Sequence, residues 1–136
     1  MTKSILLITT LLLSSLLMPG CQTLEKRDFQ VSLDSALAAY AAAMRWGHPA
    51  QAYSFLDPSL EQNTANQEAL NNIRVTNYKV LQQPAQTAED KAQQSVAIQY
   101  VLVDEQVEKT LIDNQVWKYE KETQKWTRFN AIPVFE

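Results

Sequence analysis

Residues that common active sites depend on are scarce in this chain. Its 136 residues include one cysteine, one histidine and two glycines. A single cysteine cannot form a disulfide within the fold, and a single histidine excludes a metal site with two histidine ligands. Two glycines are too few for a glycine-rich phosphate loop, and the hydrolase motif Gly-x-Ser-x-Gly does not occur. We therefore expect neither a metal ion nor a cofactor.

Positive charge is not concentrated anywhere in the chain. Lys and Arg total 12 against 15 Asp and Glu, which gives a formal net charge of -3. The closest basic cluster, Lys26-Arg27, is flanked by Glu25 and Asp28. Binding to nucleic acid requires a concentrated positive surface, so nucleic acid is excluded as a partner.

The N-terminal segment has the three parts of a secretory signal. Lys3 supplies positive charge, residues 5–18 are apolar, and the small residue Gly20 precedes Cys21. The apolar part has about 14 residues, fewer than the roughly 20 that a membrane-spanning helix needs. The pattern therefore predicts a signal peptide over residues 1–20 rather than a transmembrane helix.

The run Leu16-Leu17-Met18-Pro19-Gly20-Cys21 resembles the lipobox of bacterial lipoproteins. This resemblance implies that the Cys21 thiol receives a diacylglyceryl group, that residues 1–20 are removed, and that the new amine is acylated, for example with palmitate. The chain would then be held on the membrane through Cys21. Because Gln22 is not aspartate, resemblance to Gram-negative lipoproteins implies the outer membrane, at its periplasmic face. The alternative is an ordinary signal peptide that leaves Cys21 as a free thiol.

The rest of the chain is predicted to be a short tether followed by one domain. Residues 21–30 are polar and show no apolar period, so they are interpreted as the lipidated tether. Residues 31–136 have the length of a single small domain.

The first half of this domain has the pattern of helices. Apolar residues recur every three or four positions over residues 31–46, with Ser32 as the expected N-cap and Gly47 as a left-handed residue after the last turn. A second helix is predicted from His48-Pro49 to residue 56. Residues 59–72 are predicted to be a surface helix or a partly ordered loop.

From Ile73 onward the apolar period changes to two, which is typical of strands. We expect strands over residues 74–83, 95–103, 107–120 and 125–135, with a polar connection over 84–91. A slip in parity between Val75 and Tyr78 predicts a β-bulge. Short turns make neighbouring strands antiparallel, so the fold class is α+β with a curved four-stranded antiparallel sheet.

Two passages resemble the NTF2-like (cystatin-like α+β) superfamily. The first passage runs from the predicted helix through Gly47 and His48-Pro49-Ala50-Gln51-Ala52-Tyr53 to Asp57-Pro58. The second is the closing hairpin, from Trp117-Lys118-Tyr119 to Trp126-Thr127-Arg128-Phe129. The resemblance implies a long helix in the concave face of the sheet, often beside a cone-shaped pocket, and a possible homodimer. Members include isomerases, dehydratases, ligand carriers and non-catalytic envelope proteins. The chain is also similar to small proteobacterial lipoproteins of unknown function.

Asp113 and Gln115 are the most suggestive polar residues. They have the same strand parity as Leu111 and Trp117, so they are expected to form a polar pair on an apolar face, and Tyr100, Asp113, Gln115 and Trp117 are the residues of a possible pocket. The alternative is a register shift that turns Asp113 and Gln115 outward. His48 is interpreted either as a general base or as a corner residue beside a turn glycine.

Three functions are compatible with this sequence. The leading one is a non-enzymatic, lipid-anchored interaction module that presents a surface to a protein partner in the envelope. The second is a carrier or sensor of a small apolar ligand, which requires a closed apolar pocket of several hundred cubic ångströms, in the range of ~300–1,000 Å³. The third is an isomerase or dehydratase with Asp113 or His48 as base, which requires the base beside a cavity. We assign no catalytic residue from the sequence.

Overall fold

The computed structural model describes residues 21–136, with side chains from Leu24 onward. The predicted signal peptide, residues 1–20, and the side chain of Cys21 lie outside the described residues. Ser32–Glu136 forms a compact unit of its own. No helix within residues 21–136 is both long enough and apolar enough to span a bilayer.

Helix α2 (Cys21–Trp46) begins earlier than predicted. The expected start at Val31 is wrong, because the polar residues before it are mostly good helix formers that continue the helix without an apolar stripe. Ser32 is consequently not an N-cap. It lies inside the helix, where its Oγ accepts a hydrogen bond of 3.0 Å from Trp126 Nε1.

Gly47 follows α2 but is not in the left-handed conformation that we predicted. Among the described residues only Gln106 and Gln124 have a positive φ. A Cβ atom on Gly47 would lie 3.0 Å from the main-chain oxygen of Ala43 and 2.8 Å from Gln51 Oε1. Glycine at this corner therefore permits a close approach of the chain and is not required by backbone strain.

Three short helical segments connect α2 to the sheet. The predicted second helix is the 3-10 segment η1 (Pro49–Phe55), and the predicted surface helix or loop contains α3 (Thr64–Ala69) and η2 (Leu70–Asn72). The N-terminus of α3 is capped by Asn63, whose Oδ1 accepts from the main-chain nitrogen of Asn66 at 3.0 Å.

The sheet has four antiparallel strands in the order β1-β2-β3-β4, which confirms the predicted α+β class. Their bounds are Ile73–Ala88, Lys91–Leu102, Glu108–Glu120 and Lys125–Arg128. A register shift between Val75 and Asn77 confirms the predicted bulge.

Three strand boundaries were predicted wrongly. Of the polar connection expected over 84–91, only Glu89 and Asp90 form a turn. Strand β1 continues to Ala88 and β2 begins at Lys91, because an edge strand tolerates Pro84 and further register shifts. Strand β4 ends at Arg128 and does not reach residue 135. There, the side chain of Asn130 replaces a strand partner: its Oδ1 accepts from Val116 N at 2.9 Å, and its Nδ2 donates to Asn114 O at 2.7 Å.

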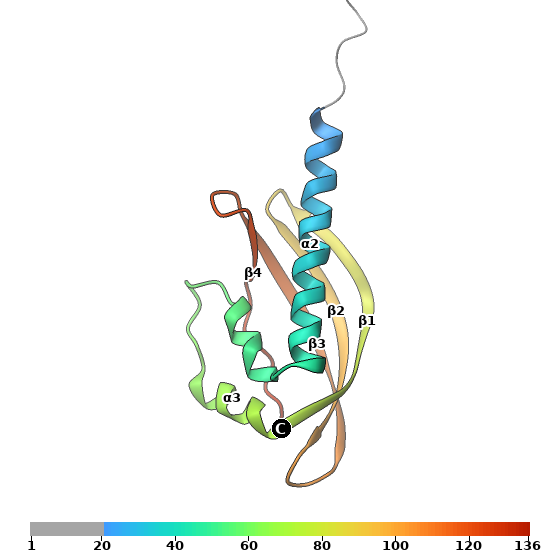
Figure 1. Cartoon of the computed structure of the whole chain (residues 1–136), viewed down its shortest axis with the longest axis vertical. Coiled ribbons are helices and arrows are strands. Elements are labelled where there is room, and N and C mark those ends of the chain that lie inside the picture. The colour runs from blue at the N-terminus through green and yellow to red at the C-terminus, as the bar shows by residue number, and fades with distance from the viewer. Residues whose placement is uncertain (1–20) are drawn as a thin grey trace, which may run out of the picture. The chain divides into compact units, whose positions relative to one another are not determined.

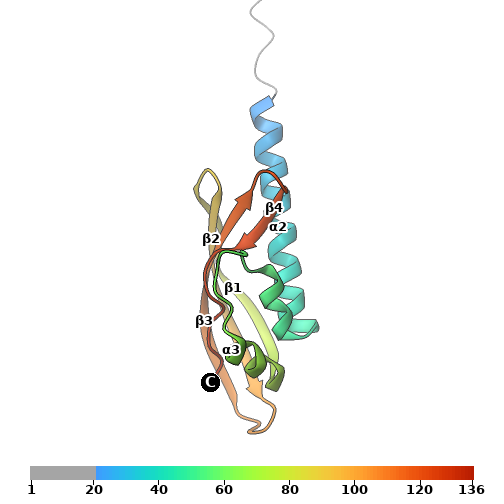
Figure 2. The ribbon, with the colours of Figure 1, turned by 90° about the vertical axis from the view of Figure 1, so that its left-hand side faces the viewer.

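The core lies between the sheet and the part of α2 that follows Ser32, which crosses one face of the curved strands (Figures 1 and 2). Tyr40 of α2 meets Trp117 of β3 edge-to-face, with ring centroids 5.5 Å apart. The remaining buried apolar residues include Leu33, Leu37, Met44, Leu70, Val96 and Ile98. Helix and sheet thus enclose a space that large side chains fill.

Candidate functional site

Asp113 and Gln115 face inward, toward α2, as strand parity leads one to expect. Their exposed fractions are 2% and 1%, and Trp117 on the same face is fully buried. The pairing of β2 with β3 runs from Lys91 opposite Lys118 to Val101 opposite Glu108 without a register shift. The outward alternative therefore does not occur.

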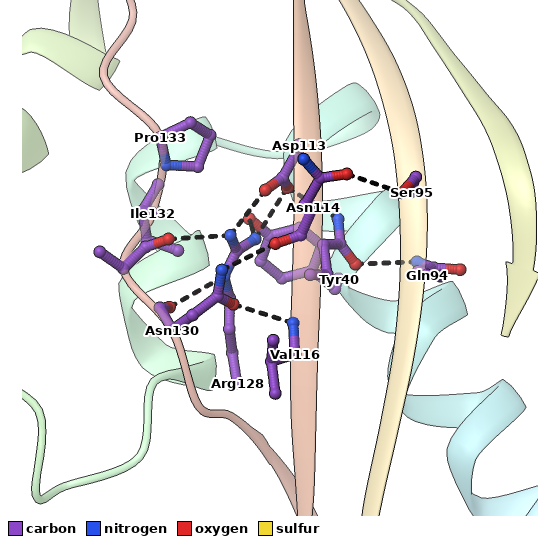
Figure 3. A network of polar contacts seen from close by, with 12 residues as sticks. Tyr40, Gln94, Ser95, Asp113, Asn114, Val116, Arg128, Asn130, Ile132 and Pro133 are labelled. Atoms are coloured by element: carbon purple, nitrogen blue, oxygen red, sulfur yellow. Dashed lines mark hydrogen bonds and ion pairs between the residues drawn. The ribbon is translucent and has the colours of Figure 1, made fainter. Parts of the chain in front are cut away.

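Asp113 forms a buried ion pair with Arg128 of β4 (Figure 3). Arg128 Nη2 lies 2.6 Å from Asp113 Oδ1, and Nη1 lies 2.8 Å from Oδ2, so the pair is bidentate. Arg128 also donates to the Tyr40 hydroxyl and to the main-chain oxygens of Asn130 and Ala131. These contacts use all of the guanidinium N–H donors.

Gln115 connects the ion pair to three further polar side chains. Its Nε2 donates to Asp113 Oδ2 and to the Tyr78 hydroxyl, both at 2.8 Å. Its Oε1 accepts from Gln94 Nε2 at 2.8 Å and from Trp117 Nε1 at 3.1 Å. The amide has partners on both its nitrogen and its oxygen, which fixes its orientation. We call the hydrogen-bonded group of these side chains the buried polar network: Asp113, Arg128, Tyr40, Gln115, Gln94, Tyr78 and Trp117.

Burial governs the protonation of this network. It raises the pKa of Tyr40 far above its ordinary value, although Arg128 acts in the opposite direction. Burial likewise raises the pKa of Tyr78 to about 12. Burial acts to lower the pKa of Arg128, but the hydrogen bonds with Asp113 and the nearby Tyr40 outweigh it, so the pKa is raised. Both tyrosines are therefore neutral and Arg128 is charged at neutral pH.

This arrangement suits a structural role for Asp113 better than acid–base chemistry. A general base must lie within hydrogen-bond reach of its substrate. Both carboxylate oxygens of Asp113 are bound to Arg128, and one also accepts from Gln115. A cavity of about 400 Å³ borders Gln115 but not Asp113. The charge of the Asp113 carboxylate is balanced by Arg128, and the group is buried in the core.

Tyr100, the fourth residue of the predicted pocket, lies apart from this network. Its hydroxyl donates to the main-chain oxygen of Glu136 at 2.8 Å, and its ring meets that of Phe135 edge-to-face with centroids 4.9 Å apart. His48 is exposed at the corner between α2 and η1 and makes no side-chain capping bond. The structure thus brings together Asp113, Gln115 and Trp117 but neither Tyr100 nor His48.

Four members of the network were not singled out as site residues: Arg128, Gln94, Tyr78 and Tyr40. Strand parity carried a signal for two of them. Arg128 shares the parity of the buried Trp126, and Gln94 shares that of Val96. On each of three strands, a polar residue has the same parity as the core residues of that strand. This pattern indicates a polar network inside the core.

Comparisons with known proteins do not indicate a function for this site. No family model, curated protein or solved structure matches this chain. Within residues 21–136, no three His, Cys, Asp or Glu side chains gather as metal ligands. The interpretation of the site therefore rests on its own geometry.

The buried tyrosines predict an alkaline transition. The pKa of Tyr78 is about 12 in the folded chain against an ordinary 10.0, so unfolded molecules release this proton first. The stability that Tyr78 contributes is fully present below pH 10 and is lost as the pH rises toward 12. Tyrosinate absorbance, measured alongside circular dichroism, should show Tyr40 and Tyr78 ionising only with unfolding. Ordinary titration of all five tyrosines in a chain that stays folded would contradict this prediction.

Proposed function

We propose that this chain is a lipid-anchored envelope lipoprotein whose NTF2-like domain acts as a non-enzymatic interaction module. The observation that carries the proposal is the filled space between α2 and the sheet. In an NTF2-like enzyme or carrier this space would hold substrate or ligand. Here Tyr40, Trp117 and Arg128 occupy it, each with no more than 1% of its surface exposed.

The other two functions receive less support from the same residues. An apolar carrier needs a closed apolar pocket, whereas the cavity of about 400 Å³ is lined mainly by amides. An isomerase needs a carboxylate free to take a proton, whereas Asp113 is held by Arg128. The proposed anchor is the acylated Cys21, and the proposed location is the periplasmic face of the outer membrane.

The turn of the β2–β3 hairpin is the surface that we propose for the partner. Val103 and Val107 flank this turn with 51% and 49% of their surface exposed. Asp104, Glu105 and Glu108 surround them, all exposed. We call these five residues the hairpin tip. An apolar pair with an acidic rim matches a partner protein whose contact surface has an apolar centre and basic edges.

Photo-crosslinking in intact cells tests this proposal. A photoreactive phenylalanine analogue at position 107 is expected to yield a discrete crosslinked protein, because Val107 would lie at the centre of the contact. The same analogue at Lys79, which is exposed on β1, is the matched control. Glu105→Lys combined with Glu108→Lys should abolish the adduct formed at position 107. Equal adducts at both positions, or none at position 107, would reject the hairpin tip as the interface.

A further inference from the structure

Strand β1 bulges where it passes β2, and the sheet is hollowed at that point. Gln82 pairs with Ser95, but the next pair is Ala85 with Gln93. Gln83 and Pro84 together therefore oppose a single residue of β2, which is a β-bulge. A cavity of about 400 Å³ lies at this bulge and is bordered by β1, β2 and β3.

The lining of this cavity is polar but carries no charge. It includes five glutamines and one asparagine, and we call it the amide cavity after them: Gln82, Gln83, Gln93, Gln94, Gln115 and Asn114. Ser95 and Thr87 add hydroxyls, and no Asp, Glu, Lys, Arg or His borders it. A charged ligand would find no counter-charge there, so the lining favours a neutral one.

Several of these polar groups are held in place by hydrogen bonds across the strands. On the sheet face away from α2, Ser95 Oγ lies 2.7 Å from Asn114 Oδ1 and 3.1 Å from Gln82 Oε1. The main chain of Asn114 is bound by Asn130. Gln115 is fixed from the other side by the buried polar network. The groups are thus positioned before any ligand arrives, which lowers the cost of binding.

Gln94 lies in the lining of the amide cavity and is also a member of the buried polar network. Only 5% of its surface is exposed, and its Nε2 donates to Gln115 Oε1. In Figure 3 its Oε1 points toward β1.

We infer that the amide cavity binds a neutral saccharide. Sugar hydroxyls both donate and accept hydrogen bonds, as do the amides and hydroxyls that line the cavity. The volume lies within the range of roughly 300–1,000 Å³ that is usual for small-ligand sites. This site is separate from the hairpin tip, so it stands whether or not that surface binds a protein.

An NMR titration of the full chain in detergent micelles tests this inference. The probes are maltotriose and tri-N-acetylchitotriose, both neutral, with glucose 6-phosphate as a charged comparison. Side-chain amide resonances of glutamine and asparagine are expected to shift in a saturable way with at least one neutral probe below roughly 10 mM. Glucose 6-phosphate is expected to cause no saturable shift, because the lining offers no counter-charge.

Matched substitutions on β2 locate the binding. Gln93→Leu removes an amide that lines the cavity and is expected to weaken binding by roughly fivefold, since one hydrogen bond is lost. Gln99→Leu makes the same change on the same face of β2, outside the cavity, and is expected to leave the affinity unchanged. The inference is overturned if neither neutral saccharide gives a saturable shift, if both variants bind equally, or if the charged probe binds as tightly as the neutral ones.

Discussion

Replacing Asp113 with asparagine is expected to lower the free energy of unfolding by about 3–5 kcal/mol. The substitution leaves the guanidinium of Arg128 charged in the core without its counter-ion, and the side chains of the pair are 0% and 2% exposed. A loss of this size is a large share of the roughly 5–15 kcal/mol that stabilises a typical domain. Urea denaturation followed by tryptophan fluorescence measures it, since Trp117 lies in the same network.

A double-mutant cycle separates the ion pair from simple loss of packing. Asp113→Leu combined with Arg128→Met removes both charges, so the double variant is expected to be more stable than the sum of the single losses predicts. The exposed pair Lys121–Glu89 is the control, and Lys121→Met should change stability little. Strictly additive losses at Asp113 and Arg128 would show that their charges are not coupled.

Replacing Cys21 with alanine is expected to move the chain almost completely from the membrane to the soluble fraction. The proposed anchor carries three acyl chains, and each buried methylene contributes about 0.8 kcal/mol to membrane binding. Fractionation of cells that produce the full chain measures the change. Mass spectrometry of the wild-type N-terminal peptide should also show the acyl groups and the removal of residues 1–20.

A second substitution separates lipidation from sorting. Gln22→Asp is expected to keep the acyl groups but to shift the chain toward the inner membrane, because Gln22 is the basis for the outer-membrane assignment. A Cys21→Ala chain that still sediments with membranes would contradict the lipid anchor. A Gln22→Asp chain that stays in the outer membrane would contradict only the sorting rule.

The fold class could be predicted because each strand carries its own alternating pattern. The pattern of β3 was sufficient to place Asp113 and Gln115 on the inner face, since parity is a local property. The end of β1 was predicted wrongly because a bulged edge strand that contains Pro84 has the composition of a loop. The early start of α2 was missed because its first turns have helical propensity but no apolar stripe to reveal them.

The buried polar network could be predicted only in part. Parity shows which face a residue occupies, but it does not show which residue lies opposite on another element. Arg128 is 15 positions from Asp113 and 88 from Tyr40, so their contacts depend on how β4 docks beside β3 and beneath α2. The interpretation of Asp113 as a base depended on that missing partner.

The distance along the chain between Tyr40 and Arg128 also bears on when this protein folds. The two residues are 88 positions apart, and loops of that length close late. If the chain is exported N-terminus first, as we propose, α2 emerges long before β4, and β3 emerges shortly before it. Until Arg128 has emerged, Asp113 would have to be buried without its counter-ion, so early collapse is unfavourable. On the proposed export route, the last strand to emerge would delay native folding until export is nearly complete, and the chain would remain unfolded and able to pass through the channel.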